Sequence, residues 1–138
     1  MQANENMSIA DANASVVRQV YAAVNANNLA DWATLLHPDV SWYTRGRSPV
    51  AGEPSGRHAV HLQFARYAAG TGGTFRASVK KLLHSDDGRV VAIHHDTGER
   101  NGKHLDVGCC TVFDLEDGLI LEGRDHFHDL YSWDEFWS

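Results

Sequence analysis

Two hydrophobic periods divide the chain, with helical spacing in its first half and strict alternation in its second. Apolar residues recur every three or four positions in 8–24, 29–36 and 57–69, which predicts three amphipathic helices. Residues 39–45 (DVSWYTR) are β-branched and aromatic and predict a first strand. The glycine- and proline-rich segment 46–56 predicts a loop before the third helix.

From Thr74 onward the apolar residues alternate, which is typical of strands with one buried face. Four strands are predicted, at about 74–84, 89–97, 104–114 and 119–128. The short turns between them favour antiparallel pairing of neighbours. The inward positions of the first and third of these strands are predicted to be Phe75, Ala77, Val79, Leu83, Leu105, Val107, Cys109, Thr111 and Phe113.

The order of these elements predicts an α+β fold. Ser132 and Glu135 have the spacing of a capping box and predict a short terminal helix. Helices that precede a four-stranded meander pack on one face of a curved antiparallel sheet and enclose an apolar pocket. We therefore expect a single domain over residues 10–138, preceded by a flexible tail at 1–9.

The last predicted strand places one acid on the face that should be buried. Alternation puts Asp125 on the same side as Leu119, Leu121, Gly123 and Phe127. A carboxylate there is costly unless it is paired, protonated or placed in a working cavity. Asp125 is thus the leading candidate for a catalytic acid/base. The competing interpretation is a structural carboxylate paired with Arg124, with a histidine of a neighbouring strand, or with backbone amides.

Two further polar residues share one face of the predicted strand 89–97. If that face is turned inward, His94 and Asp96 are candidate catalytic residues that polarise a carbonyl or orient Asp125. In the alternative they cap the end of the sheet in solvent. The residues expected to line a substrate pocket are Trp42, Thr44, Phe64, Cys109, Leu121 and Phe127.

A metal site on the last strand is the weaker of two interpretations. His126 and His128 share its outer face, and Glu122 or His95 could complete a ligand set. No third ligand can be placed from the sequence, so a polar dimer surface is the preferred interpretation. We expect no metal and no other cofactor.

The composition narrows the class of partner. The chain has 138 residues and a formal net charge of -6, which disfavours a nucleic-acid partner. It has no apolar run long enough for a membrane span, and its first residues lack the features of a signal peptide, so we expect a cytoplasmic protein. Cys109 and Cys110 are adjacent and point to opposite faces of a strand, which predicts free thiols.

Three stretches together resemble the nuclear transport factor 2-like superfamily. They are VVRQVYAAVNANNLADWATLLHPDVSWY, AGEPSGRHAV and DGLILEGRDHFHDLYSWDEFW. Within the superfamily the chain is similar to the SnoaL-like group, which is related to polyketide cyclases and ketosteroid isomerases. The resemblance implies a cone-shaped curved sheet wrapped around three N-terminal helices. It also implies a homodimer formed through the outer sheet face and a small lipophilic ligand inside the cone.

The catalytic residues of related enzymes match this sequence unevenly. The oxyanion-hole tyrosine, its partner aspartate and the base of ketosteroid isomerases fall on Val20, about Cys109, and Thr44, so steroid isomerisation is not expected. In limonene-epoxide hydrolases the last-strand aspartate matches Asp125. The arginine and second aspartate of those hydrolases fall on Asp96 and Gly98.

In the SnoaL-type cyclases, a single last-strand aspartate is the acid/base of an intramolecular aldol closure, and Asp125 matches it. The resemblance thus implies a small-molecule enzyme that moves protons on a lipophilic carbonyl compound, by cyclisation, isomerisation or dehydration. The alternative is a non-catalytic protein that binds such a ligand.

Overall fold

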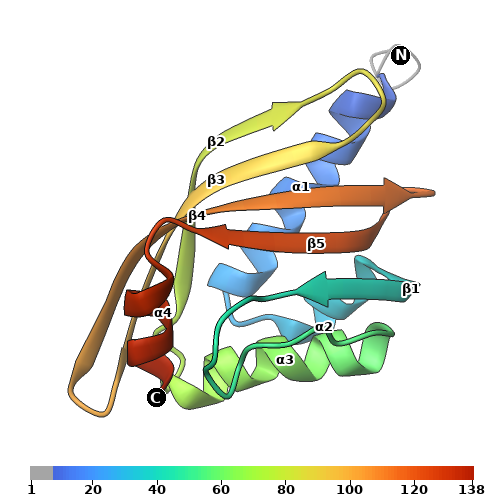
Figure 1. The fold of residues 1–138 in the computed structure, drawn as a ribbon. Helices are drawn as coiled ribbons and strands as arrows, with labels where there is room; N and C mark the ends of the chain where they lie inside the picture. Colours follow the sequence, from blue (N-terminus) through green and yellow to red (C-terminus); the bar gives the residue numbers. More distant parts are fainter. Residues whose placement is uncertain (1–7) are drawn as a thin grey trace.

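The computed structural model describes residues 8–138. Its elements, in chain order, are α1 (Ile9–Asn25), α2 (Leu29–Thr34), β1 (Leu36–Tyr43), α3 (Arg57–Gly70), β2 (Arg76–His84), β3 (Val90–Arg100), β4 (Lys103–Glu116), β5 (Leu119–Phe127) and α4 (Leu130–Trp137) (Figure 1). The side chain of Ser8 caps α1 by accepting a hydrogen bond from the Asp11 amide. Ser8 and Ile9 therefore belong to the start of α1, and the rest of the expected tail lies outside the described residues.

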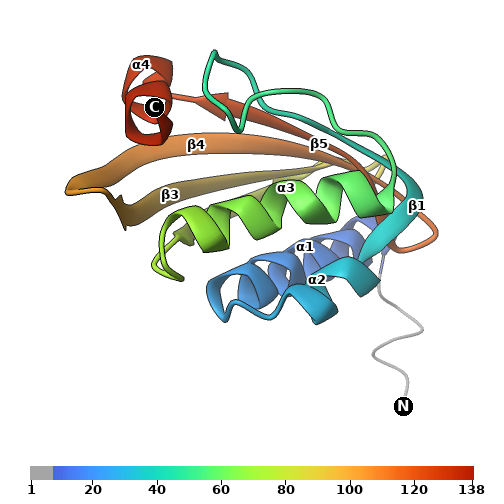
Figure 2. The same cartoon turned by 90° about the horizontal axis from the view of Figure 1, so that it is seen from below.

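The five strands form one curved, unclosed sheet in the order β1-β5-β4-β3-β2, with the three N-terminal helices on one side (Figure 2). β2 pairs with β3, β3 with β4, and β4 with β5, all in antiparallel, which confirms the predicted meander. The α+β architecture is confirmed as well. The expectation of a purely antiparallel sheet is wrong for β1, which pairs with β5 in parallel. Periodicity identified this strand without naming its partner.

Two β-bulges interrupt the predicted alternation. In β5, Ile120 pairs with Leu115 and Glu122 pairs with Asp114, which leaves Leu121 as an extra residue. Ile120 is consequently buried in the core and Leu121 is only half-buried, the reverse of the prediction. A second register shift lies between Val79 and Lys81 of β2. Beyond it Leu83 is 46% exposed, although it was expected to face inward.

Helix α4 begins at a different cap from the one predicted. Asp129, not Ser132, is the N-cap, and it accepts hydrogen bonds from the Ser132 amide (3.1 Å) and hydroxyl (2.7 Å). Those hydrogen bonds lower the pKa of Asp129. At the other end of the helix, Lys103 Nζ donates to the Glu135 carbonyl (2.8 Å) and Arg100 donates to the Phe136 carbonyl (3.3 Å). Cations are favourable there because the last carbonyls of a helix are unpaired.

The interior is dominated by aromatic side chains. The ring centroids of Trp32 and Phe64 are 4.3 Å apart, and those of Phe127 and Trp133 are 4.1 Å apart in a stacked pair. Both cysteines are free thiols, as predicted. Among residues 8–138, no helix is both long enough and apolar enough to cross a membrane.

Gly123 lets the indole of Trp42 lie directly against β5. A Cβ atom at position 123 would stand 2.6 Å from two carbons of that ring. We expect Gly123→Ala to lower the free energy of unfolding by about 1–3 kcal/mol, the usual cost of overpacking a core. Urea denaturation followed by circular dichroism measures the loss.

The control is Gly98→Ala in β3, where the added Cβ would meet nothing closer than 3.5 Å and the backbone φ is not in the left-handed region. Its loss should be clearly smaller. Equal losses in the two variants would contradict the close packing of Trp42 on β5.

Candidate functional site

A cavity of about 30 Å³ lies between the concave face of the sheet and the helices. This is room for about two water molecules. Most of its wall is apolar or aromatic, formed by Val20, Tyr21, Val24, Trp42, Phe64, Tyr67, Phe75, Ala77, Phe127 and Trp133. The other lining residues are polar and come from the three central strands: His94, Asp96, Thr111 and Asp125.

Asp125 is 8% exposed and is held by three neutral donors. Its Oδ2 accepts hydrogen bonds from Trp42 Nε1 (2.9 Å) and Thr44 Oγ1 (3.0 Å), and its Oδ1 accepts one from Thr111 Oγ1 (2.8 Å). Each carboxylate oxygen can accept two hydrogen bonds. Oδ1 accepts only one from the described residues, so its second acceptor position is open to a ligand. The expected alternative partner Arg124 is bonded to Glu122 instead.

His94 and Asp96 face inward, not into solvent. His94 Nδ1 lies 2.6 Å from Asp96 Oδ1, and His94 Nε2 lies 2.8 Å from Thr111 Oγ1. Because Thr111 also bonds to Asp125, the four residues form one continuous hydrogen-bonded chain. The inward position of Thr111 was predicted from alternation, but its place between His94 and Asp125 was not.

Burial raises the pKa values of several groups in and around this hydrogen-bonded chain. Desolvation raises the pKa of Asp96, against the opposing effect of its hydrogen bond to His94. Desolvation also raises the pKa values of Tyr21 and Cys109, and the negative charge of Asp125 adds to it. Tyr21 and Cys109 therefore stay neutral, and Cys109 is no nucleophile.

The sequence profile of the SnoaL-like domain matches residues 17–133, which is most of the chain. The chain belongs to the SnoaL-like family. The predicted resemblance is thereby confirmed. The uncharacterized protein Rv0034 of Mycobacterium tuberculosis (strain ATCC 25618 / H37Rv) is 27% identical over 128 residues, covering 93% of this chain and 98% of that protein.

Solved structures share this fold. Bal32a, from a soil-derived mobile gene cassette, is 50% identical with a TM-score of 0.93, over 95% of this chain and 100% of its own. A candidate SnoaL-like polyketide cyclase from Jannaschia sp. CCS1 is 19% identical with a TM-score of 0.78, over 96% of each chain. At this lower identity the likeness shows the fold alone.

The residues expected to line a pocket are only partly brought together in this SnoaL-like domain. Trp42, Phe64 and Phe127 lie on the cavity wall, and their contact with a substrate stays a prediction. The other three do not line the cavity. Thr44 reaches it only through its hydrogen bond to Asp125, Cys109 is buried with its thiol 3.8 Å from Thr111 Oγ1, and Leu121 is turned away by the β-bulge.

Two buried donors of the SnoaL-like domain were missed by the sequence analysis. The hydroxyl of Tyr67 and the indole Nε1 of Trp133 have no hydrogen-bond partner within the described part of the chain. Both residues line the cavity that holds Asp125. Leaving a buried donor unpaired is unfavourable, so these two groups are suited to receive an oxygen acceptor from a ligand. Their inward position was the only signal in the sequence.

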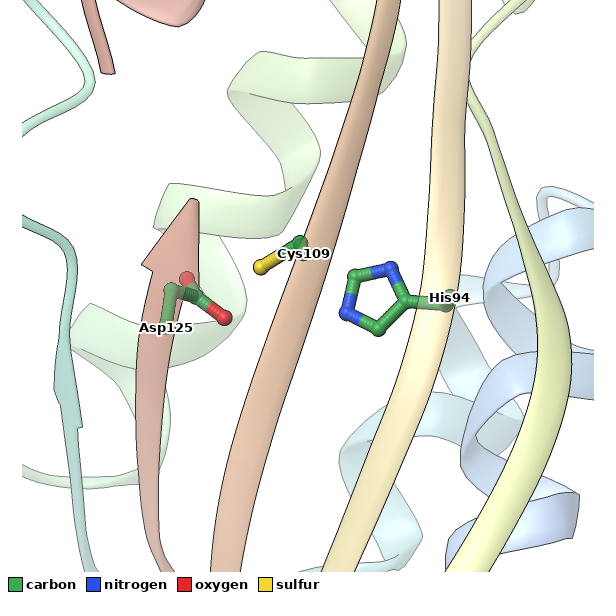
Figure 3. A group of neighbouring side chains, drawn as sticks. All are labelled: His94, Cys109 and Asp125. Atoms are coloured by element: carbon green, nitrogen blue, oxygen red, sulfur yellow. The ribbon is translucent and has the colours of Figure 1, made fainter. Parts of the chain in front are cut away.

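The side chains of His94, Cys109 and Asp125 come from β3, β4 and β5 and lie close together (Figure 3). Each offers one potential ligand atom, and these three atoms lie within 4.8 Å of one another. We do not assign them as metal ligands. The Thr111 hydroxyl already bonds to both His94 and Asp125, and burial keeps Cys109 a neutral thiol. His126 and His128 are exposed and belong to no group of three potential ligands among residues 8–138.

The raised pKa of Asp96 makes stability depend on pH. The folded protein binds a proton that the unfolded chain, with a pKa near 3.8, releases. The contribution to stability is therefore full below the unfolded pKa and is lost as pH rises through the folded pKa. Asp96→Asn does not titrate, so its free energy of unfolding should improve relative to the natural protein as pH rises.

Urea denaturation at several pH values measures this difference. The control is Asp86→Asn in the exposed turn before β3, which should keep a constant difference from the natural protein. Parallel pH curves for the Asp96 variant and the natural protein would show that Asp96 does not keep its proton on folding.

Proposed function

We propose that this protein is a small-molecule enzyme that transfers a proton to or from a lipophilic carbonyl compound, with Asp125 as the acid/base. The observation that carries the proposal is a carboxylate at a mostly apolar cavity that is solvated by three neutral donors and, within residues 8–138, by no cation. A carboxylate locked in a salt bridge would be a poor base. Asp125 keeps an acceptor position on Oδ1 for a substrate proton.

Binding of the carbonyl group is supported by the unpaired donors of the same cavity. With the carbonyl oxygen at the Tyr67 hydroxyl or the Trp133 indole N–H, Asp125 Oδ1 takes a proton from the neighbouring carbon. The electron pair of the broken C–H bond forms the enolate, whose negative oxygen strengthens the hydrogen bond that it receives. Donors that are already in place need no rearrangement during this step.

The second half of the reaction decides its type. Protonated Asp125 returns its proton to a different carbon in an isomerisation or to a departing hydroxyl in a dehydration. In a cyclisation the enolate carbon attacks a second carbonyl of the same molecule, and the proton goes to the new alkoxide. All three begin with the same enolate, so one carboxylate serves each of them.

Substrate entry requires the walls to move. A cavity of about 30 Å³ is too small for an aromatic ketone. The stacked rings of Phe127 and Trp133 form part of the wall, and α4 carries Trp133. We expect these rings to separate when a ligand enters.

A non-catalytic binding protein is the second candidate, and the mostly apolar lining favours it. Such a protein would bind the same compounds without moving their protons. Hydrogen–deuterium exchange at the carbon beside a carbonyl distinguishes the two functions, since only an acid/base accelerates it.

The test uses 1-indanone and a panel of related aromatic ketones in D₂O, with exchange followed by proton NMR. Asp125→Asn keeps the shape and removes the proton acceptor, so exchange should fall by about 10²–10⁴-fold while binding survives. Quenching of tryptophan fluorescence measures binding. Asp114→Asn, in β4 and outside the cavity, should behave as the natural protein. Binding without accelerated exchange supports the carrier function, and full exchange by the Asp125 variant rules out the assignment.

We also propose a homodimer that forms through the outer face of the sheet. Half-buried Val91, Ile93 and Val112 lie on this face beside the exposed Arg124 and His126. Aliphatic residues with a polar border are typical of protein interfaces. Glu122 contributes to the polar border through its bond to Arg124.

Sedimentation velocity at micromolar concentration should give about twice the 15.3 kDa of one chain. Val112→Glu places a charge within the aliphatic patch and should shift the protein to the monomer, because an unpaired charge is costly to bury. A 15.3 kDa species alone in the natural protein would exclude the dimer.

A further inference from the structure

The hydrogen-bonded chain that ends at Asp125 begins at a second buried carboxylate. Asp96, His94 and Thr111 are each no more than 5% exposed, and the three links measure 2.6, 2.8 and 2.8 Å. The proposed chemistry at Asp125 needs only one carboxylate. The second acid and its imidazole therefore require an explanation of their own.

The single hydroxyl proton of Thr111 restricts how this chain is protonated. When the hydroxyl donates to Asp125, its oxygen can only accept from His94, so Nε2 carries a proton. A neutral imidazole then has its lone pair on Nδ1, and the proton of the 2.6 Å contact comes from Asp96. Burial raises the pKa of Asp96, in agreement with this arrangement.

The chain can also run in the opposite direction with the same number of protons. One proton passes from Asp96 to His94 Nδ1, a second from Nε2 to the Thr111 oxygen, and a third from Thr111 to Asp125 Oδ1. Each donor bond that breaks is matched by one that forms. Asp125 is now the acid, Asp96 carries the negative charge, and no proton has been exchanged with solvent.

We propose that Asp96, His94 and Thr111 form a closed proton relay through which Asp125 can be presented either as a base or as an acid. The relay deepens the proposed function and rests on it for its purpose. It suits a reaction that must begin by protonating the substrate as well as one that begins by deprotonating it. Thr111 is the switching group, and all three residues act on the substrate's proton through Asp125.

Within residues 8–138, two other titrating groups lie against the relay residues, and one of them, Tyr21, also shares a hydrogen bond with Thr111. Tyr21 of α1 packs on the His94 ring at 5.0 Å between centroids, and Cys109 of β4 lies beside Thr111. Burial keeps both protonated. The β2 neighbour of His94 is the apolar Val79, and His95 is on the outer face, bonded to Asp106.

NMR of the free protein tests the relay without any substrate. Histidine labelled with ¹⁵N and aspartate labelled with ¹³C at the carboxyl carbon report the tautomer of His94 and the protonation of Asp125 at a series of pH values. His94→Asn and Asp125→Asn identify the signals. The relay predicts that the fraction of His94 in the Nδ1–H form equals the fraction of Asp125 that is protonated, at every pH measured.

Thr111→Val keeps the volume of the side chain and removes the switching hydroxyl. In this variant the tautomer of His94 should no longer follow the protonation of Asp125. Thr111→Ser retains the hydroxyl and should keep the two coupled. The relay is wrong if the Nδ1–H fraction of His94 does not follow the protonation of Asp125 in the natural protein. It is equally wrong if Thr111→Val behaves like the natural protein.

This outcome is independent of the ketone-exchange experiment. Coupled signals together with full exchange by Asp125→Asn would support the relay and exclude the proposed function. If the two signals are not coupled but Asp125→Asn loses the exchange activity, the proposed function is supported and the relay is excluded.

Discussion

The structure depends on the solvation of one buried carboxylate by the protein itself. Asp125 has left water, and an isolated charge in an apolar interior is highly unfavourable. Its hydrogen bonds come from Trp42 and Thr44 on one side of β5 and from Thr111 on the other. The donors are separated from it by as many as 83 residues, so these hydrogen bonds exist only when β1, β5 and β4 have paired.

The arrangement of β1, β5 and β4 follows from this requirement. The parallel register places Trp42 opposite Gly123, where only a residue without a side chain leaves space for the indole. The antiparallel register places Thr111 opposite Asp125. Two pairings of different direction thus bring donors to both oxygens of one side chain. The all-neutral donor set holds the carboxylate in place without placing a charged donor against it.

Much of this arrangement could be predicted from local sequence, and the rest depends on tertiary contacts. Alternation correctly turned Asp125 inward and placed His94 and Asp96 on one shared face, because the side chains of an unbroken strand must alternate. Whether that face looked inward was left open by the sequence. It failed at Leu121 and Leu83, where a bulge inserts a residue that no sequence period reveals. Thr111 was expected inward with no role, since a threonine at a core position has no distinguishing signal until its neighbours are known. The parallel partner of β1 was missed for the same reason.

Helix α4 is held by its backbone, whereas its side chain Trp133 faces the cavity. Arg100 and Lys103 at the β3–β4 hairpin grip the last turn of α4 by its backbone carbonyls, which every amino acid provides. These hydrogen bonds therefore do not depend on which side chain stands at position 133. In such a scaffold, a substitution at the cavity-lining position of α4 changes the wall and leaves the carboxylate, its three donors and the backbone attachment of the helix in place.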